Sequence, residues 1–338
     1  ESKNFLDNLA QDDALNLFSQ VNRNISPVDD SVGPDAGFNF TWGNSYDIYD
    51  DWRVGFLLTS GYDSETEVRE EYELEQADRV GEEIIITRFF DEIDTTERTV
   101  QWSSMLNLGI DYNRNHKIDY SLIVLNDTSD EISEKFGHTE NLSVSEGVRI
   151  RDISIDYEER TMYTNQFKGM HTFPEWNFIG FDWRYSLGRS VRYAPGNTQA
   201  RFAIADSNED GLFTDSDDIS LLDAQTAARY TFQNLHDRLE NYGYNFTLPT
   251  ALGRWEIEVK AGADFVSKSR TAENRRFDVN TLAFEDRSLL QGDDFGAILS
   301  DDVLSTAAFV ESNNRAIIRD TTLAGDDYVA AQKVDAYY

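Results

Sequence analysis

The fold class is decided by residues 99–126, which read Thr-Val-Gln-Trp-Ser-Ser-Met-Leu-Asn-Leu-Gly-Ile-Asp-Tyr-Asn-Arg-Asn-His-Lys-Ile-Asp-Tyr-Ser-Leu-Ile-Val-Leu-Asn. Every second residue from Val100 to Tyr112 falls on one, mostly apolar face, and the residues between them are mostly polar. This period of two lasts about twice as long as in an ordinary globular strand. The four residues Asn-Arg-Asn-His at 113–116 form a polar turn signal, and the alternation then returns from Ile118 onward. The stretch therefore predicts a long β-hairpin over residues 99–135.

The length of this hairpin indicates its environment. Trp102 and Tyr112 lie ten positions apart on the apolar face. At ~3.3 Å per residue they are roughly 33 Å apart along the strand. A tilt of about 40° reduces this to roughly 25 Å, the height of the lipid-facing band between the aromatic girdles of a membrane β-barrel. The hairpin therefore predicts a segment of barrel wall.

Similar alternation recurs along the chain. We expect strands around residues 38–42, 54–73, 84–90, 150–173, 177–187, 242–248 and 257–265, with about nine or ten strands in total. The predicted connections are short at 47–51, 113–116, 172–175 and 249–253. They are long at 127–147, from 188 to about 227, and from about 269 to 327. Short periplasmic turns that alternate with long extracellular loops are typical of outer-membrane barrels. The inner faces carry charges, such as Glu256, Glu258, Lys260 and Asp264, which suit a watery or plugged lumen.

Composition excludes several classes of protein. The chain has 338 residues, no cysteine and a formal charge of −33, which argues against a surface for nucleic acid or anionic lipid. The 13% content of aromatic residues argues against disorder. No apolar run is long enough for a transmembrane helix, whereas barrel strands need an apolar residue only at every second position.

Some segments resemble a known family. They are Pro-Asp-Ala-Gly-Phe-Asn-Phe-Thr at 34–41, Asp-Trp-Arg-Val-Gly-Phe at 51–56, Arg-Asp-Thr-Thr at 319–322 and Lys-Val-Asp-Ala-Tyr-Tyr at 333–338. Together with the barrel pattern they resemble TonB-dependent outer-membrane receptors, and most of all the large acidic receptors of aquatic Gram-negative bacteria. The resemblance implies a 22-stranded barrel closed by an N-terminal plug. It also implies uptake of a ferric siderophore, cobalamin, haem or a glycan with energy from the inner membrane.

The chain departs from that family in two ways. It contains no plug-like region and no TonB-contacting box, and it has too few strands for the whole barrel. We therefore expect an internal piece of a longer protein, with an extramembrane loop segment at 1–35 and a partial barrel at 36–338. The alternative is a small free-standing barrel. The expected partners are outer-membrane lipid, a small-molecule or glycan ligand and, by resemblance alone, the plug and TonB. The expected location is the outer membrane of a Gram-negative cell.

The sharpest local motif lies at 206–217, Asp-Ser-Asn-Glu-Asp-Gly-Leu-Phe-Thr-Asp-Ser-Asp. The predicted Ca²⁺ ligands are Asp206, Asn208, Asp210, the carbonyl of Leu212, Thr214 and Asp217. Gly211 stands at the sixth position, where a calcium loop turns sharply. Aspartate at the twelfth position resembles the dockerin-type loop, so we expect a helix around Ile219 to Leu222. The alternative is an acidic surface turn without a metal.

Catalytic motifs are lacking. The four histidines, His116, His138, His171 and His236, are scattered in the sequence, and no phosphate loop, zinc spacing or nucleophile elbow is present. Acidic pairs such as Asp293-Asp294 are expected in so acidic a chain and are weak evidence for a glycosidase. The sequence thus predicts a transport receptor and not an enzyme. The alternative is a soluble, calcium-binding β-sandwich that serves as a surface or adhesion module.

Overall fold

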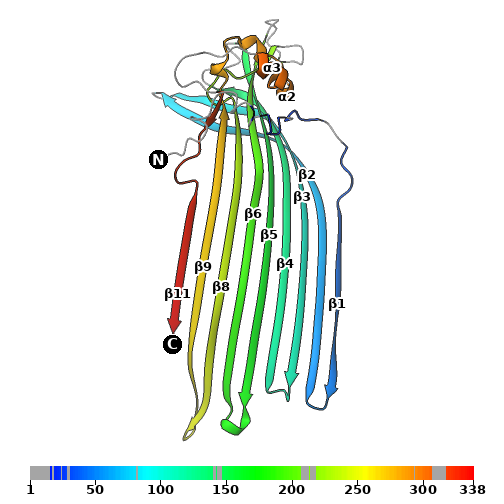
Figure 1. The fold of residues 1–338 in the computed structure, drawn as a ribbon, viewed down its shortest axis with the longest axis vertical. Coiled ribbons are helices and arrows are strands. Elements are labelled where there is room, and N and C mark those ends of the chain that lie inside the picture. The colour runs from blue at the N-terminus through cyan, green and yellow to red at the C-terminus, as the bar shows by residue number, and fades with distance from the viewer. Residues whose placement is uncertain are drawn as a thin grey trace.

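The protein is an open β-sheet in this computed structural model, which describes residues 16, 19–23, 25–28, 31–80, 83–139, 142, 147–206, 213, 218–292, 294–306 and 317–338. All eleven described strands belong to one antiparallel sheet (Figure 1). This confirms the prediction of an all-β antiparallel fold. The sheet does not close on itself. In the described part of the chain, no helix has both the length and the apolar content needed to span a membrane.

The strands are β1 (Ala36–Tyr49), β2 (Trp52–Val80), β3 (Glu83–Tyr112), β4 (His116–Thr139), β5 (Val148–Phe173), β6 (Ile179–Ala205), β7 (Asp218–Leu221), β8 (Ala228–Leu252), β9 (Trp255–Val279), β10 (Ile318–Asp320) and β11 (Tyr328–Tyr337). The described helices are short: η3 (Pro174–Trp176), η4 (Thr281–Ala283), η5 (Arg287–Leu290), α2 (Phe295–Ile298) and α3 (Asp301–Thr306). Apart from η3, all of these helices lie between β9 and β10.

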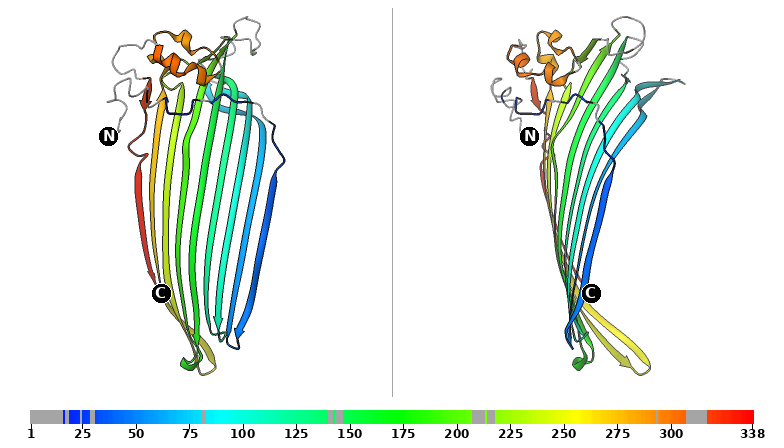
Figure 2. Two further views of the ribbon diagram at one scale, coloured as in Figure 1. Left: turned by 45° about the vertical axis from the view of Figure 1, so that its right-hand side comes forward. Right: turned by 90° about the vertical axis from the view of Figure 1, so that its right-hand side faces the viewer.

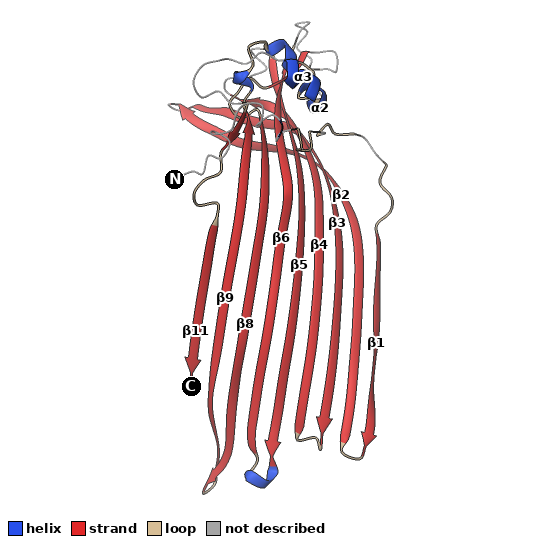
Figure 3. Ribbon diagram, in the orientation of Figure 1, coloured by secondary structure: helices blue, strands red, loops and turns tan. Residues whose placement is uncertain are grey.

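Neighbours in the sequence are neighbours in the sheet. The order is β1-β2-β3-β4-β5-β6-β8-β9-β10, while β7 pairs with β6 and β11 pairs with β9. The short turns before β2, β4, β6 and β9 all lie at one end of the sheet, which we call the lower end (Figure 3). Helices α2 and α3 lie at the opposite, upper end (Figure 3). The predicted asymmetry between short and long connections is present, although β2 and β3 also meet at the upper end with only two residues between them.

Several strands are longer than the sequence pattern predicted. The predicted loops at 127–147, 188–227 and 269–327 are wrong in part, because β4 runs to Thr139, β6 runs to Ala205 and β9 runs to Val279. The reason is that polar residues remain strand-forming when both neighbours complete the backbone ladder. Asp130, for example, faces Arg98 on β3 and Tyr157 on β5.

The fourth short turn is also tighter than predicted. Strand β8 continues through Pro249 to Leu252, so the turn consists of Gly253 and Arg254. Gly253 has φ +61°, a left-handed conformation that glycine adopts without strain.

The main hydrophobic core lies at the upper end only. Phe202, Tyr230 and Val279 on the strands pack in one cluster with Phe284 and Phe295 from the helical segment. Ile25, from the N-terminal segment, joins the same cluster and is 2% exposed. Below this cluster, the sheet in Figure 2 is one layer thick. The sandwich alternative required a second sheet packed on the first, but every strand that the structure describes belongs to the same sheet.

Candidate functional faces of the sheet

One face of the sheet carries an apolar band. The register places Val54 opposite Ile110, and Ile110 opposite Ile118. We define the apolar band as the same-face residues of β2–β5 between the Trp52 and Tyr62 levels: Val54, Phe56, Leu58, Ser60, Ile110, Leu108, Leu106, Ser104, Ile118, Tyr120, Leu122, Val124, Gly169, Phe167, Asn165 and Tyr163. None of these residues is charged.

The apolar band is not covered by protein in the described structure. Leu108 is 43% exposed, Ile110 is 44% exposed and Ile118 is 43% exposed. The band continues onto β1, where Phe40 and Trp42 are more than half exposed. A soluble protein rarely leaves so large a contiguous apolar surface in contact with water.

A row of aromatic rings borders the band at the lower end. The ring of Trp52 lies 4.6 Å from that of Tyr112, and Tyr112 lies 6.1 Å from His116. The row continues through His171 and Phe181 to Phe246, with 4.8 Å between the centroids of the last two rings. At the upper level, Phe38 stacks on Tyr62, which faces Trp102 on β3. Rings therefore flank the band at two levels about 33 Å apart along the strands.

Two of the four histidines meet in the lower row. The Nδ1 atoms of His116 and His171 are 3.3 Å apart, and the indole N–H of Trp183 donates to Nε2 of His171 over 3.1 Å. Because an indole N–H only donates, Nε2 of His171 carries no proton in this arrangement. These two histidines are far apart in the sequence, and the pairing of β4 with β5 brings them together. Aligning the hairpins by their turns would have revealed it, since His116 directly follows one turn and His171 closely precedes the next.

The opposite face, which we call the polar face, holds pairs of opposite charge. Of the four inner-face residues predicted from the sequence, Lys260 lies 2.6 Å from Glu258, and Asp264 pairs with Arg184 on β6. Glu256 is exposed on the same strand. A cross-strand pair of Arg270 and Asp237 has two contacts of 2.7 Å. Charges concentrate on this face while the opposite band is free of them.

Two hollows of opposite character lie on the polar face. The acidic hollow has a volume of about 510 Å³ and is lined by five carboxylates, two arginines and several polar side chains: Glu97, Thr99, Gln101, Asp127, Ser129, Glu131, Asp156, Glu158, Arg160, Arg192 and Asn197. The basic hollow lies nearer the upper end, has a volume of about 360 Å³ and is lined by Arg88, Lys135, Arg201 and Arg229, with Asp152 among them. The polar face is therefore divided into an acidic and a basic zone.

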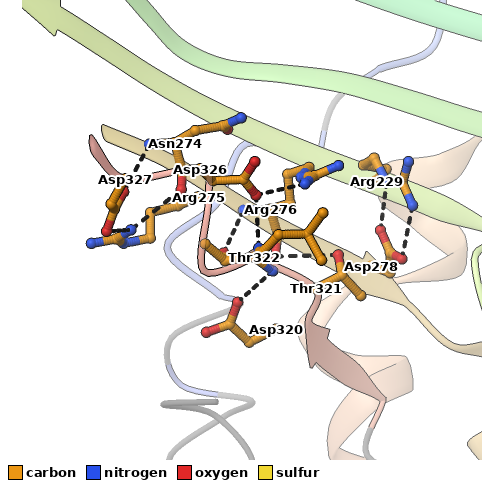
Figure 4. Close-up of polar contacts among 11 residues, drawn as sticks. Arg229, Asn274, Arg275, Arg276, Asp278, Asp320, Thr321, Thr322, Asp326 and Asp327 are labelled. Atoms are coloured by element: carbon orange, nitrogen blue, oxygen red, sulfur yellow. Dashed lines mark hydrogen bonds and ion pairs between the residues drawn. The ribbon is translucent and has the colours of Figure 1, made fainter. Parts of the chain in front are cut away.

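The segment after β10 forms ion pairs and hydrogen bonds with the upper end of β9. The Arg276 guanidinium donates to Asp326 over 2.5 Å, and the Arg275 guanidinium donates to Asp327 over 2.5 Å (Figure 4). Thr322 accepts from the Arg276 backbone N–H over 2.9 Å. We call these contacts the upper clasp. The clasp holds the segment that leads into β11 against the sheet.

The predicted calcium ligands fall mostly outside the described residues. Only Asp206 is described. It follows β6 directly, and its backbone N–H donates to the carbonyl of Gly147 over 2.9 Å. Asn208, Asp210, Leu212, Thr214 and Asp217 lie outside the described residues. In the part of the chain that the structure describes, no group of three or more His, Asp or Glu side chains has a metal-binding arrangement.

The predicted helix after the calcium motif is wrong. Residues Asp218–Leu221 form strand β7, which pairs antiparallel with β6 from Ala205 to Phe202. Leu221 is 2% exposed and belongs to the main core cluster. Its apolar side chain is therefore buried as part of a strand and not of a helix. The calcium motif therefore connects the two strands of a β-hairpin.

Comparisons with protein families, with curated proteins and with solved structures found no match. A function is therefore inferred from the chemistry of the two faces of the sheet.

Proposed function

We propose that the sheet is part of the wall of an outer-membrane β-barrel and that the protein takes part in uptake of a nutrient as a receptor. In this proposal the apolar band contacts lipid, the polar face lines the lumen, and the upper end with the long connections faces outward. The nutrient is a solute such as a ferric siderophore or a glycan. The TonB-dependent mode of transport rests on sequence resemblance alone.

The apolar band is the single observation that carries the proposal. At ~3.3 Å per residue and a tilt of about 40°, the ten positions from Trp52 to Tyr62 span roughly 25 Å across a membrane. The band has this height, lacks charges and is bordered by aromatic rings, as lipid-facing barrel surfaces are. Charged side chains cost about 2–4 kcal/mol at the midplane on that side, which accounts for their segregation to the polar face.

The proposal is tested on the whole protein produced in a Gram-negative host. A barrel that stays folded in SDS migrates differently before and after boiling, so we expect a mobility shift for protein extracted from the outer-membrane fraction. Recovery of the protein in the soluble fraction, with the same mobility before and after boiling, would contradict the proposal. The same result would favour a soluble surface module.

We also propose that residues 206–217 bind Ca²⁺ outside the cell. Support comes from the spacing of oxygen ligands in the sequence and from the place of the motif in the chain, between the end of β6 at Ala205 and the start of β7 at Asp218. Calorimetric titration of the calcium-free protein should give saturable heat at or below about millimolar Ca²⁺. Asp210→Ala removes the fifth-position ligand and should abolish that heat. Absence of heat from the unaltered protein at millimolar Ca²⁺ would exclude the site.

A further inference from the structure

Three side chains at the lower end of the sheet form a hydrogen-bond chain. The indole N–H of Trp183 donates to Nε2 of His171 over 3.1 Å, and the Nδ1 atoms of His171 and His116 are 3.3 Å apart. Because Nε2 of His171 accepts from the indole, the proton of the neutral His171 ring lies on Nδ1. His171 then donates to Nδ1 of His116, whose own proton lies on Nε2. The hydrogen-bond chain is therefore complete when both rings are neutral.

Protonation of either ring breaks the hydrogen-bond chain. A proton added to His171 goes to Nε2, where it faces the indole N–H of Trp183. A proton added to His116 goes to Nδ1, where it faces the N–H of His171. The centroids of the two rings are 5.4 Å apart, so two charged rings would also repel each other. Since histidine ordinarily titrates at about pH 6.5, mild acid is enough to add this charge.

The same pair of rings contacts the turn between β5 and β6. Phe173 packs edge-on against His116 with 5.3 Å between the ring centroids, and Trp176 of η3 stacks on Phe173 at 5.1 Å. Asn177 and Phe178 follow with φ of 56° and 59°. This left-handed conformation is costly for a bulky residue such as Phe178. The aromatic contacts from Trp176 through Phe173 to His116 help to offset that strain.

Ionisable groups on the neighbouring elements surround the pair of histidines. They are Tyr112, Arg114, Lys117, Glu175 and Asp182. Tyr112 stacks on His116 with 6.1 Å between the centroids, and the charge of Asp182 attracts a proton to His171. Lys117 lies on the polar face and pairs with Asp119 over 3.3 Å. Within the described structure, none of these groups hydrogen-bonds to either ring, so the two histidines are the titrating members of the hydrogen-bond chain.

We propose that the His116–His171 pair is a pH-sensitive latch for the turn between β5 and β6. With both rings neutral, the latch holds Phe173 and η3 against the lower end of β4. When the pair takes up a proton, the hydrogen-bond chain breaks, the rings separate and the turn moves away from β4. In the proposed barrel this turn faces the periplasm, so the latch responds to periplasmic pH. That location rests on the proposed function, whereas the latch itself does not.

The test is ¹⁹F NMR of the whole protein, labelled with 5-fluorotryptophan in detergent and titrated from about pH 7.5 to about pH 5, which spans the ordinary titration of histidine. The chain has six tryptophans, and the variants Trp183→Phe and Trp176→Phe identify two of the resonances. Trp183 reports on the bond to His171, and Trp176 reports on the turn. We expect both resonances to shift along one titration curve, because the same protonation releases both contacts.

The double variant His116→Gln with His171→Gln removes both titrating rings, and neither resonance should then shift with pH. If this variant does not fold, His116→Gln alone replaces it. That single variant should abolish the shift of Trp176 and leave the shift of Trp183, which contacts His171 directly. The matched control is His138→Gln at the upper end of β4, where the ring lies 5.9 Å from that of Phe89. Both shifts should be unchanged in the control.

The latch is overturned if neither resonance shifts over this pH range, or if both shifts survive in the double variant. A shift of Trp183 without a shift of Trp176 would overturn the release of the turn. The titration requires only folded protein, whereas the membrane proposal is tested by fractionation and gel mobility. Either proposal can therefore fail alone.

Discussion

At the residue scale, the lower aromatic row depends on a glycine. Gly169 on β5 faces Trp183 on β6, and a Cβ atom at this glycine would come within 2.1 Å of the indole Nε1. The indole therefore lies over the glycine, where it donates to His171. Only a residue without a side chain permits this packing.

Gly169→Ala should therefore destabilise the protein by about 1–3 kcal/mol, because the indole must move out of its position. The measurement is the midpoint of denaturant-induced unfolding. Gly188→Ala is the matched control on the same strand pair, since its nearest neighbour would lie 3.7 Å away. Equal midpoints for the two variants would show that Trp183 does not pack against Gly169.

A second residue-scale prediction concerns Asp326 in the upper clasp. Burial alone would raise the pKa of this carboxyl, but hydrogen bonds from the Arg276 guanidinium and the Leu323 amide outweigh burial and lower the pKa below 3.8. A depressed pKa means that the contribution to stability is complete above the unfolded-state value of 3.8 and is lost as pH falls through the folded-state value. The clasp should therefore loosen only at pH below about 4.

Amide hydrogen exchange of residues 321–327 measures this loosening. We expect protection that is constant from pH 7 to about pH 4, after correction for the intrinsic exchange rate, and that falls below it. Asp326→Asn should lower protection at neutral pH and remove most of the acid dependence. An acid dependence that survives unchanged in Asp326→Asn would assign the effect to another group.

At the element scale, residues 127–139 form the upper part of β4, where the sequence predicted a loop. Residues 127–137 pair with both β3 and β5 in the structure, although the polar composition of this stretch predicted a loop. A six-residue Gly-Ser insertion after Asp130 should abolish folding, because it interrupts ladders with β3 and β5 at once. The same insertion after Arg114, in the turn between β3 and β4, should be tolerated. Folded yield, measured by the mobility shift, would be equal for both insertions if residues 127–139 formed a loop.

The sequence predicted the lower halves of the strands well for a physical reason. Where one face is apolar, as from Val54 to Tyr62, a period of two is visible in the residue types alone. Nearer the upper end both faces carry polar residues, as at Thr128 and Ser129, so the period disappears while the backbone ladder continues. The strands extend there because their backbones pair with neighbouring strands, and residue types alone do not reveal that pairing.

The functional features also differ in whether the sequence alone predicts them. The apolar band could be predicted on β2, β3 and β4, since each of these strands shows the pattern by itself. The basic hollow could not, because Arg88, Asp152 and Arg201 are far apart in the sequence and meet only through the register of β3, β4, β5 and β6. The core around Phe284 and Phe295 was also missed, because its residues lie in a segment predicted as a loop.

At the scale of the whole molecule, hydrophobic side chains are distributed unlike those of a soluble domain. The main core is confined to the upper end, while large apolar side chains such as Leu108 and Ile110 remain exposed farther down. A membrane would cover that surface and would supply the stabilisation that a second protein layer gives to a sandwich. The proposed barrel wall therefore requires lipid against the apolar band and water against the polar face.

Cysteine labelling in the membrane tests that claim most directly, because the chain contains no cysteine of its own. Single variants Leu108→Cys and Leu122→Cys place thiols in the apolar band, and Asn107→Cys and Ser121→Cys place them on the polar face of the same strands. If lipid covers the band, a charged, water-soluble maleimide should label only the polar-face thiols, and a lipid-soluble pyrene maleimide should label the band thiols. Equal labelling of both faces by the charged reagent would contradict lipid contact at the band.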